Sequence, residues 1–171
     1  MMLLTRVVDL LDSRQIPHAL IGAAALAAKG IARSTFDIDL LTTDTRVLAD
    51  EWWAPLAEHA TVDVRRGEAD DPLAGVVRID VPGDRPVDLV VGRHGWQARA
   101  VARAERGAGG PPVVTTLDLI LLKLYAGGAQ DLWDVRELLR QPGADDLPAA
   151  VGAELAALPQ AMRDAWNDVR R

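Results

Sequence analysis

The spacing of apolar residues changes along this chain, and each spacing predicts a different kind of element. Residues 2–15 carry leucine and valine at helical spacing, which predicts an amphipathic helix. Short runs rich in valine, isoleucine and leucine, bounded by Gly, Pro and Asp, predict strands. The predicted strands cover residues 18–23, 36–42, 61–66, 75–81 and 87–92.

Helical spacing returns between these strands and dominates the last third of the chain. We expect Thr43 or Thr45 to cap the first of these longer helices, and Thr116 to cap a later one. The predicted helices cover residues 24–30, 45–59, 93–107, 117–127 and 129–140, with two short helices after them. Early strands and late helices predict an α/β (α+β) fold, with a short mixed twisted sheet, flanking helices and a helical C-terminal part.

Two aspartates interrupt the apolar strand predicted at 36–42. Because residues i and i+2 of a strand share a face, Asp37 and Asp39 are expected to point together. Phe36, Ile38 and Leu40 are then expected to face the core. Neighbouring carboxylates repel and are costly to desolvate, and a divalent cation resolves both costs. Oxygen ligands without cysteine or clustered histidine favour Mg²⁺ or Mn²⁺.

A third carboxylate of the same character is Asp88, within the run VDLVVG. If that strand neighbours the Asp37–Asp39 strand, three carboxylates converge, as two-cation phosphoryl chemistry requires. Asp-x-Asp pairs also occur on solvated strand faces and in turns. A phosphatase family with an Asp-x-Asp nucleophile is another candidate, but the preceding residues ARSTF fit its apolar strand poorly.

A strand, a glycine turn and a helix are predicted just upstream, in LIGAAALAAKG. Gly22 at the helix start would let a phosphate approach free backbone N–H groups, and Ala23 and Ala24 keep that approach open. The run lacks Gly-Lys-Ser/Thr, so it is no Walker loop. An alanine-rich helix by itself also fits simple packing.

Composition narrows the function classes. The chain has 171 residues, a formal net charge of −6 and no cysteine, which excludes disulfides and thiolate metal sites. Such a charge disfavours general nucleic-acid or membrane binding but allows a local basic cleft. Without a signal-peptide core or a run of transmembrane length, we expect a cytoplasmic protein with no membrane partner. Lys29 and Lys123 are the chain's lysines, the other basic residues being arginine.

With these residues in order, the chain resembles the nucleotidyltransferase superfamily with the DNA polymerase beta-like core. It is most similar to the AbiEii-like branch of type IV toxin–antitoxin systems. That branch combines an apolar strand, a small-residue turn, a short helix ending in Gly, Arg-x-Thr-x-Asp-x-Asp, a later Asp, and a Lys before an acidic helix. The matching residues here are Leu20, Ile21, Gly22, Ala23, Gly30, Arg33, Thr35, Asp37, Asp39, Asp88, Lys123, Asp131 and Asp134.

This resemblance, which spans roughly residues 18–139, implies transfer of a nucleoside monophosphate from an NTP to an acceptor. Asp37 and Asp39 would hold Mg²⁺ or Mn²⁺ on the triphosphate. Asp88 would bind a second metal ion and help deprotonate the acceptor hydroxyl. Gly22 and Ala23 would contact the β- and γ-phosphates through backbone amides.

Four further residues have roles implied by the same resemblance. Lys123 would supply a point charge to the triphosphate. Arg33 and Ser34 would contact phosphate or order the loop. Asp131 would be an active-site acid near the acceptor or Lys123. The alternatives are ordinary ones, because a lysine on an apolar helix often reaches solvent and an acidic helix face is often only hydrated.

The resemblance leaves the partners open. The acceptor would be tRNA or another macromolecule if the protein is a toxin with a cognate antitoxin. Alternatively, it would be a small molecule of the aminoglycoside or lincosamide type. A third reading is a non-catalytic nucleotide-binding or regulatory module, because Ala23 stands where the family places glycine or serine. We expect residues 1–110 to form the catalytic core and residues 111–171 a helical part covering its cleft, in one compact unit.

Overall fold

The computed structural model describes residues 2–107 and 109–171, and the chain divides into two compact units. The first unit contains the chain up to residue 28 together with residues 32–114. The second unit contains residues 29–31 and 115–171. The sheet belongs to the first unit, and the long helices near the C-terminus belong to the second.

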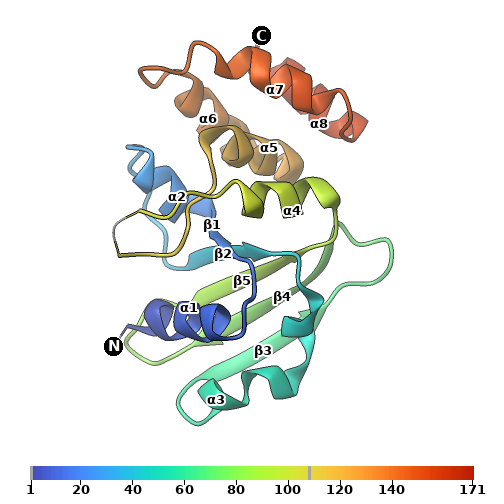
Figure 1. The fold of residues 1–171 in the computed structure, drawn as a ribbon. Helices are drawn as coiled ribbons and strands as arrows, with labels where there is room; N and C mark the ends of the chain where they lie inside the picture. The colour runs from blue at the N-terminus through green and yellow to red at the C-terminus, as the bar shows by residue number, and fades with distance from the viewer. Residues whose placement is uncertain (1, 108) are drawn as a thin grey trace. The chain divides into compact units, whose positions relative to one another are not determined.

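A five-stranded mixed sheet forms the centre of the first unit, with the strand order β1-β2-β5-β4-β3 (Figure 1). The strands are Ala19–Leu20 (β1), Ile38–Thr42 (β2), Thr61–Arg66 (β3), Leu73–Asp80 (β4) and Val87–Gly92 (β5). Strands β2 and β5 are parallel, and the other neighbours are antiparallel. The predicted fold class and the mixed sheet are therefore confirmed.

One face of this sheet is buried and packs with helix α1 (Leu3–Ser13). Alternate residues of β2, β4 and β5 supply this core, among them Ile38 and Leu40 on β2. The prediction for Phe36 is wrong, because its residue is 75% exposed. Strand β2 begins only at Ile38, so Phe36 lies in the preceding loop, where the two-residue alternation does not apply.

The helix predicted at 45–59 is broken into three short pieces. These are η1 (Thr45–Leu48), η2 (Asp50–Trp53) and α3 (Ala54–Ala57). The cap is Asp44, not Thr43 or Thr45, and its carboxylate accepts from the Arg46 N–H at 3.0 Å. The indole N–H of Trp53 donates to the Val47 carbonyl at 2.7 Å. In a continuous helix that carbonyl would accept from a backbone N–H four residues later.

Two more helices complete the first unit, and four form the second. Those of the first unit are α2 (Gly22–Ala28) and α4 (Gly95–Ala102). Those of the second are α5 (Thr116–Ala126), α6 (Ala129–Leu139), α7 (Leu147–Leu155) and α8 (Gln160–Val169). Thr115, rather than Thr116, caps α5 by accepting from the Asp118 N–H at 3.1 Å. None of the helices described is long and apolar enough to cross a membrane.

Candidate nucleotide and metal site

A row of charged residues crosses the sheet. Parallel pairing sets Asp39 of β2 beside Asp88 of β5, so these two strands are the neighbours that a carboxylate cluster requires. Antiparallel pairing then sets Arg78 of β4 beside Asp88, and Asp63 of β3 beside Arg78. Directly paired residues share a face, and here it is the one opposite the buried core. The row therefore lies on the sheet face opposite the one that packs with α1.

Asp37 stands one residue before β2, in a loop that is tied in place. The Thr35 hydroxyl donates to Oδ1 of Asp37 at 2.9 Å and also approaches its carbonyl oxygen at 3.2 Å. Arg85, which precedes β5, donates to the carbonyls of Asp37 at 3.0 Å and Thr35 at 3.3 Å. These bonds hold the Asp37 backbone at the edge of the strand pair that carries Asp39 and Asp88.

Arg78 is the charge partner of two of these carboxylates. Its Nη1 donates to Oδ2 of Asp88 at 2.8 Å and lies 3.7 Å from Oδ2 of Asp37. Burial raises the pKa of the Asp88 carboxyl above its usual value, and the Arg78 guanidinium opposes that rise. The charge of Asp37 adds to the rise, and Arg65 opposes it more weakly.

Gly22 lies directly against the side chain of Asp39. A Cβ placed on Gly22 would stand 2.0 Å from Oδ2 of Asp39, closer than atoms can approach. Gly22 also has φ +62°, a conformation that residues with a side chain rarely adopt. The Ile21 N–H donates to the Asp39 carbonyl at 3.0 Å, which fixes the turn against β2. The residue must therefore be glycine for this turn to reach the carboxylate.

The other predicted phosphate contacts of the first unit lie next to this turn or in the loop before β2. Ala23 follows Gly22 at the start of α2 and is half-buried. Arg33 is half-buried in the loop between α2 and β2, and Ser34 beside it is exposed. Their roles toward phosphate stay predictions.

Lys123 and two acids form a compact cluster within the second unit. Lys123 Nζ lies 2.8 Å from Oδ1 of Asp131 and 2.8 Å from Oδ2 of Asp134. The Lys123 side chain is only 14% exposed and that of Asp134 only 1%, so this lysine does not reach into solvent. Asp131 also accepts from the Gly128 N–H at 3.2 Å, which orients its carboxylate at the start of α6.

Two opposing effects act on the Lys123 amine. Burial alone would lower its pKa, because the charged form loses hydration. Hydrogen bonds to Asp131 and Asp134 outweigh burial, and the net shift raises the pKa of Lys123 above its usual value. The amine is therefore held as a cation by two carboxylates. Its role at the triphosphate stays a prediction.

Arg78 and Arg85 are the site residues that the sequence interpretation missed. Arg78 interrupts the apolar alternation of β4 as Asp88 interrupts that of β5, which is the one local signal available. Its pairing with Asp88 depends on strand register, which spacing alone does not reveal. Arg85 acts on backbone carbonyls 48 to 50 residues away, and no sequence pattern marks such a contact.

Asp37, together with Asp39 and Asp88 of the row, fits a hard divalent cation by its chemistry. Asp37, Asp39 and Asp88 offer oxygen ligands only, as Mg²⁺ and Mn²⁺ prefer. Oδ1 of Asp88 is buried without a hydrogen-bond donor, which is costly unless a cation or donor satisfies it. In the described residues, no three acidic or histidine side chains converge on one point, and Arg78 contributes positive charge among the three aspartates.

The fold is shared with solved structures of other proteins. It is similar to ANT(2″)-Ia in complex with adenylyl-2″-tobramycin, with a TM-score of 0.57 and 19% identity over 92% of this chain and 97% of that one. A candidate nucleotidyltransferase from H. pylori has a TM-score of 0.53 and 15% identity over 98% and 90% of the two chains. No protein-family model and no curated protein sequence matches this chain. Similarities at this level of identity show the fold.

Proposed function

We propose that this protein is a Mg²⁺-dependent nucleotidyltransferase that moves a nucleoside monophosphate from an NTP to an acceptor hydroxyl. The observation that carries the proposal is the pairing of Asp39 with Asp88 across parallel strands, with Gly22 packed against Asp39. Asp37 lies beside this pair at the edge of the sheet. Together with the fold, this arrangement provides a pair of carboxylates, with a third beside them, next to a backbone turn that has no side chain.

The roles of the residues follow from their positions. Asp37 and Asp39 would hold the cation with the triphosphate, while the Gly22 turn would offer backbone N–H groups to the phosphates. When bound, Mg²⁺ would neutralise phosphate charge and favour ionisation of the acceptor hydroxyl. The Asp88 carboxylate would help to bind the cations and would take up the proton of the acceptor hydroxyl. The hydroxyl oxygen bonds to the α-phosphorus, and pyrophosphate leaves.

Label transfer tests this function. Purified protein is incubated with NTPs labelled at the α- or the γ-phosphate, with Mg²⁺ or with a chelator. The acceptors offered are total RNA, cell protein, tobramycin and a lincosamide. We expect the α-label, and not the γ-label, to join an acceptor only when Mg²⁺ is present.

Two variants sharpen this experiment. Asp39→Asn should lower transfer by at least about a hundredfold, because a ligand of the cation is lost. Asp50→Asn removes a carboxylate that is exposed and paired with Arg66, and should leave transfer unchanged. No transfer by the wild type, or equal transfer by wild type and Asp39→Asn, would refute the proposal.

The acceptor separates the finer alternatives. A toxin of the AbiEii-like branch would label tRNA or another macromolecule, and its Asp39→Asn variant would cease to inhibit growth. The similarity to ANT(2″)-Ia, which covers nearly the whole of both chains, favours a small-molecule acceptor as the second candidate. Label on tobramycin, with raised tolerance of cells to it, would select that candidate. Magnesium-dependent NTP binding without any transfer would instead select the regulatory module.

A further inference from the structure

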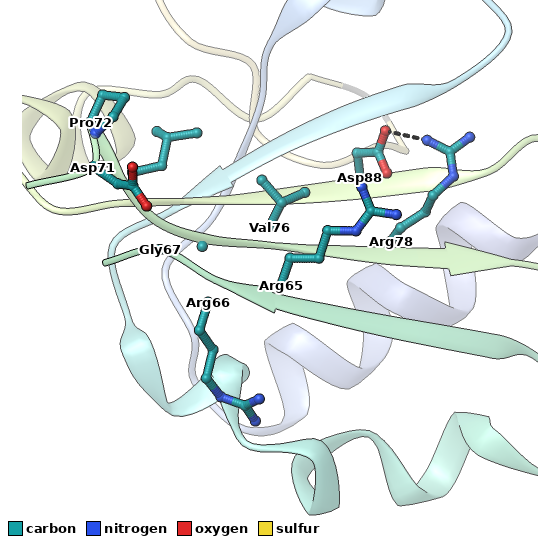
Figure 2. Close-up of a pocket in the computed structure, with 10 residues that line it drawn as sticks. Arg65, Arg66, Gly67, Asp71, Pro72, Val76, Arg78 and Asp88 are labelled. Atoms are coloured by element: carbon teal, nitrogen blue, oxygen red, sulfur yellow. Dashed lines mark hydrogen bonds and ion pairs between the residues drawn. The ribbon is translucent and has the colours of Figure 1, made fainter. Parts of the chain in front are cut away.

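A hollow of about 430 Å³ opens on the sheet face next to Asp88 (Figure 2). Strands β3 and β4 and the loop that joins them surround it. Its lining residues include Arg65, Val76, Arg78 and Asp88. Arg93 donates to two carbonyls of the joining loop and to the Leu73 carbonyl at the start of β4, which holds that wall in place. The hollow is therefore built from ordered strands and a tethered loop, and it touches the proposed catalytic carboxylate.

Two arginines present unused donors at this hollow. Arg78 engages Asp88 and Asp37 through Nη1, and among the described residues nothing bonds to its Nε or Nη2. Arg65 engages Asp63 through Nε and Nη2, and its Nη1 has no partner in the part of the chain described. The Arg78 side chain is 37% exposed and the Arg65 side chain 75%, so both guanidinium groups can be reached from solvent. Figure 2 shows the Arg65 side chain extending toward Asp88 and Arg78.

Two other carboxylates near the hollow, those of Asp71 and Asp63, leave these guanidinium donors available. Asp71 accepts from the Glu68 N–H at 2.6 Å within the joining loop, and Asp63 pairs with Arg65. Neither one occupies the remaining guanidinium donors of Arg65 and Arg78. A guanidinium with free N–H groups binds oxyanions through charge-assisted hydrogen bonds, and it repels a polycation such as an aminoglycoside.

We propose that Arg65 and Arg78 form an oxyanion subsite in this hollow, and that the acceptor carries a phosphate or carboxylate group near its reactive hydroxyl. The assignment to the acceptor rests on the proposed function. Because Arg78 contacts Asp88 with one nitrogen, it links the bound oxyanion to the carboxylate that would take the hydroxyl proton. The acceptor class is therefore anionic rather than polycationic.

Binding is tested without any transfer reaction. The full chain, labelled with ¹⁵N, is titrated with glycerol 3-phosphate, which carries hydroxyls and a phosphate, and separately with glycerol. We expect glycerol 3-phosphate, but not glycerol, to shift the Nε–H signals of Arg65 and Arg78. Arg65→Gln should weaken this binding about tenfold, since a charged donor is lost. The matched control is Arg46→Gln, an exposed arginine that pairs with Asp44 and is not among the residues lining the hollow, and it should bind as the wild type does.

A second arm separates the acceptor's phosphate from the phosphates of the NTP. The titration is repeated with a non-hydrolysable NTP and Mg²⁺ at saturation. Persisting shifts at Arg65 support an acceptor subsite. Displacement of glycerol 3-phosphate by the NTP would overturn the acceptor assignment.

Three further outcomes would overturn the subsite itself. They are the absence of shifts, equal affinity in wild type and Arg65→Gln, and equal binding of tobramycin in the hollow. The dispersed spectrum of each variant shows whether it is folded. Because no label transfer is measured, this subsite and the proposed function can fail independently.

Discussion

Gly22 has no room for a side chain, and this restriction is the most specific link between a residue and the proposed chemistry. The turn passes so close to Asp39 that a single carbon would collide with the carboxylate. A turn that approaches a carboxylate so closely can bring its N–H groups to a phosphate that the same carboxylate holds through a cation. The glycine thus connects the fold to the proposed nucleotide binding.

We predict that Gly22→Ala destabilises the protein by more than its backbone conformation alone would cost. The matched control is Gly83→Ala, because Gly83 has φ +85° and no neighbour within 4 Å of an added Cβ. The control should lose about 1–2 kcal/mol from the unfavourable φ alone. Gly22→Ala should lose at least about 1 kcal/mol more, measured by urea unfolding, because Asp39 must move. Equal losses in the two variants would show that the contact with Asp39 is not tight.

Helices α5 and α6 are joined by charge as well as by apolar packing. Asp134 is almost fully buried, and Lys123 is the cation that compensates it, with Asp131 at the rim of the cluster. Removing one member of a buried ion pair leaves the other charge without compensation, which costs more than the pair itself contributes. This cluster therefore contributes to the stability of the second unit whether or not Lys123 also serves a triphosphate.

Lys123→Met should destabilise the protein by about 3 kcal/mol, because Asp134 is left buried without its counter-charge. Lys29→Met, at the chain's other lysine, is the matched control and should change stability by less than about 0.5 kcal/mol. Lys123→Met combined with Asp134→Leu should recover much of the loss. Urea unfolding of the four proteins provides the comparison, and similar losses at the two lysines would contradict the ion-pair account.

The same cluster predicts a dependence of stability on pH. The pKa of Lys123 is raised in the folded state, so its stabilising charge is fully present below the unfolded pKa of lysine, about 10.4. The stabilisation is lost as pH rises through the folded-state pKa. The difference in unfolding free energy between wild type and Lys123→Met should therefore be constant near pH 8–9 and shrink above about pH 11. A difference that does not change over this range would be evidence against the raised pKa.

At the scale of the whole molecule, the spacing of apolar residues could predict single strands and helices but not the contacts between them. Alternation within single strands placed Asp39 and Asp88 on apolar strands, and the early strands and late helices predicted the mixed sheet with helices. Arg78 could not be found in this way, because its partner is set by the register of β4 against β5. Residues 45–59 have helical spacing, yet the Trp53 indole N–H donates to the Val47 carbonyl, which a continuous helix would need for its own hydrogen bonds.

The charge of the whole chain also differs from the charge at the hollow. The protein carries a net charge of −6, yet Arg65 and Arg78 both line the hollow beside Asp88. Net charge describes the average surface, whereas ligand recognition depends on the few groups that line a site. An acidic protein can therefore carry a local cationic site for an anionic acceptor.

The central claim is that Asp37, Asp39 and Asp88 hold a divalent cation with a triphosphate at the Gly22 turn. Crystals soaked with Mn²⁺ and a non-hydrolysable NTP test it most directly, with diffraction recorded at the manganese absorption edge. We predict an anomalous peak among the three carboxylates, triphosphate oxygens at the Gly22 turn, and no such peak in Asp39→Asn crystals. Manganese bound elsewhere, or a triphosphate away from Gly22, would contradict the account.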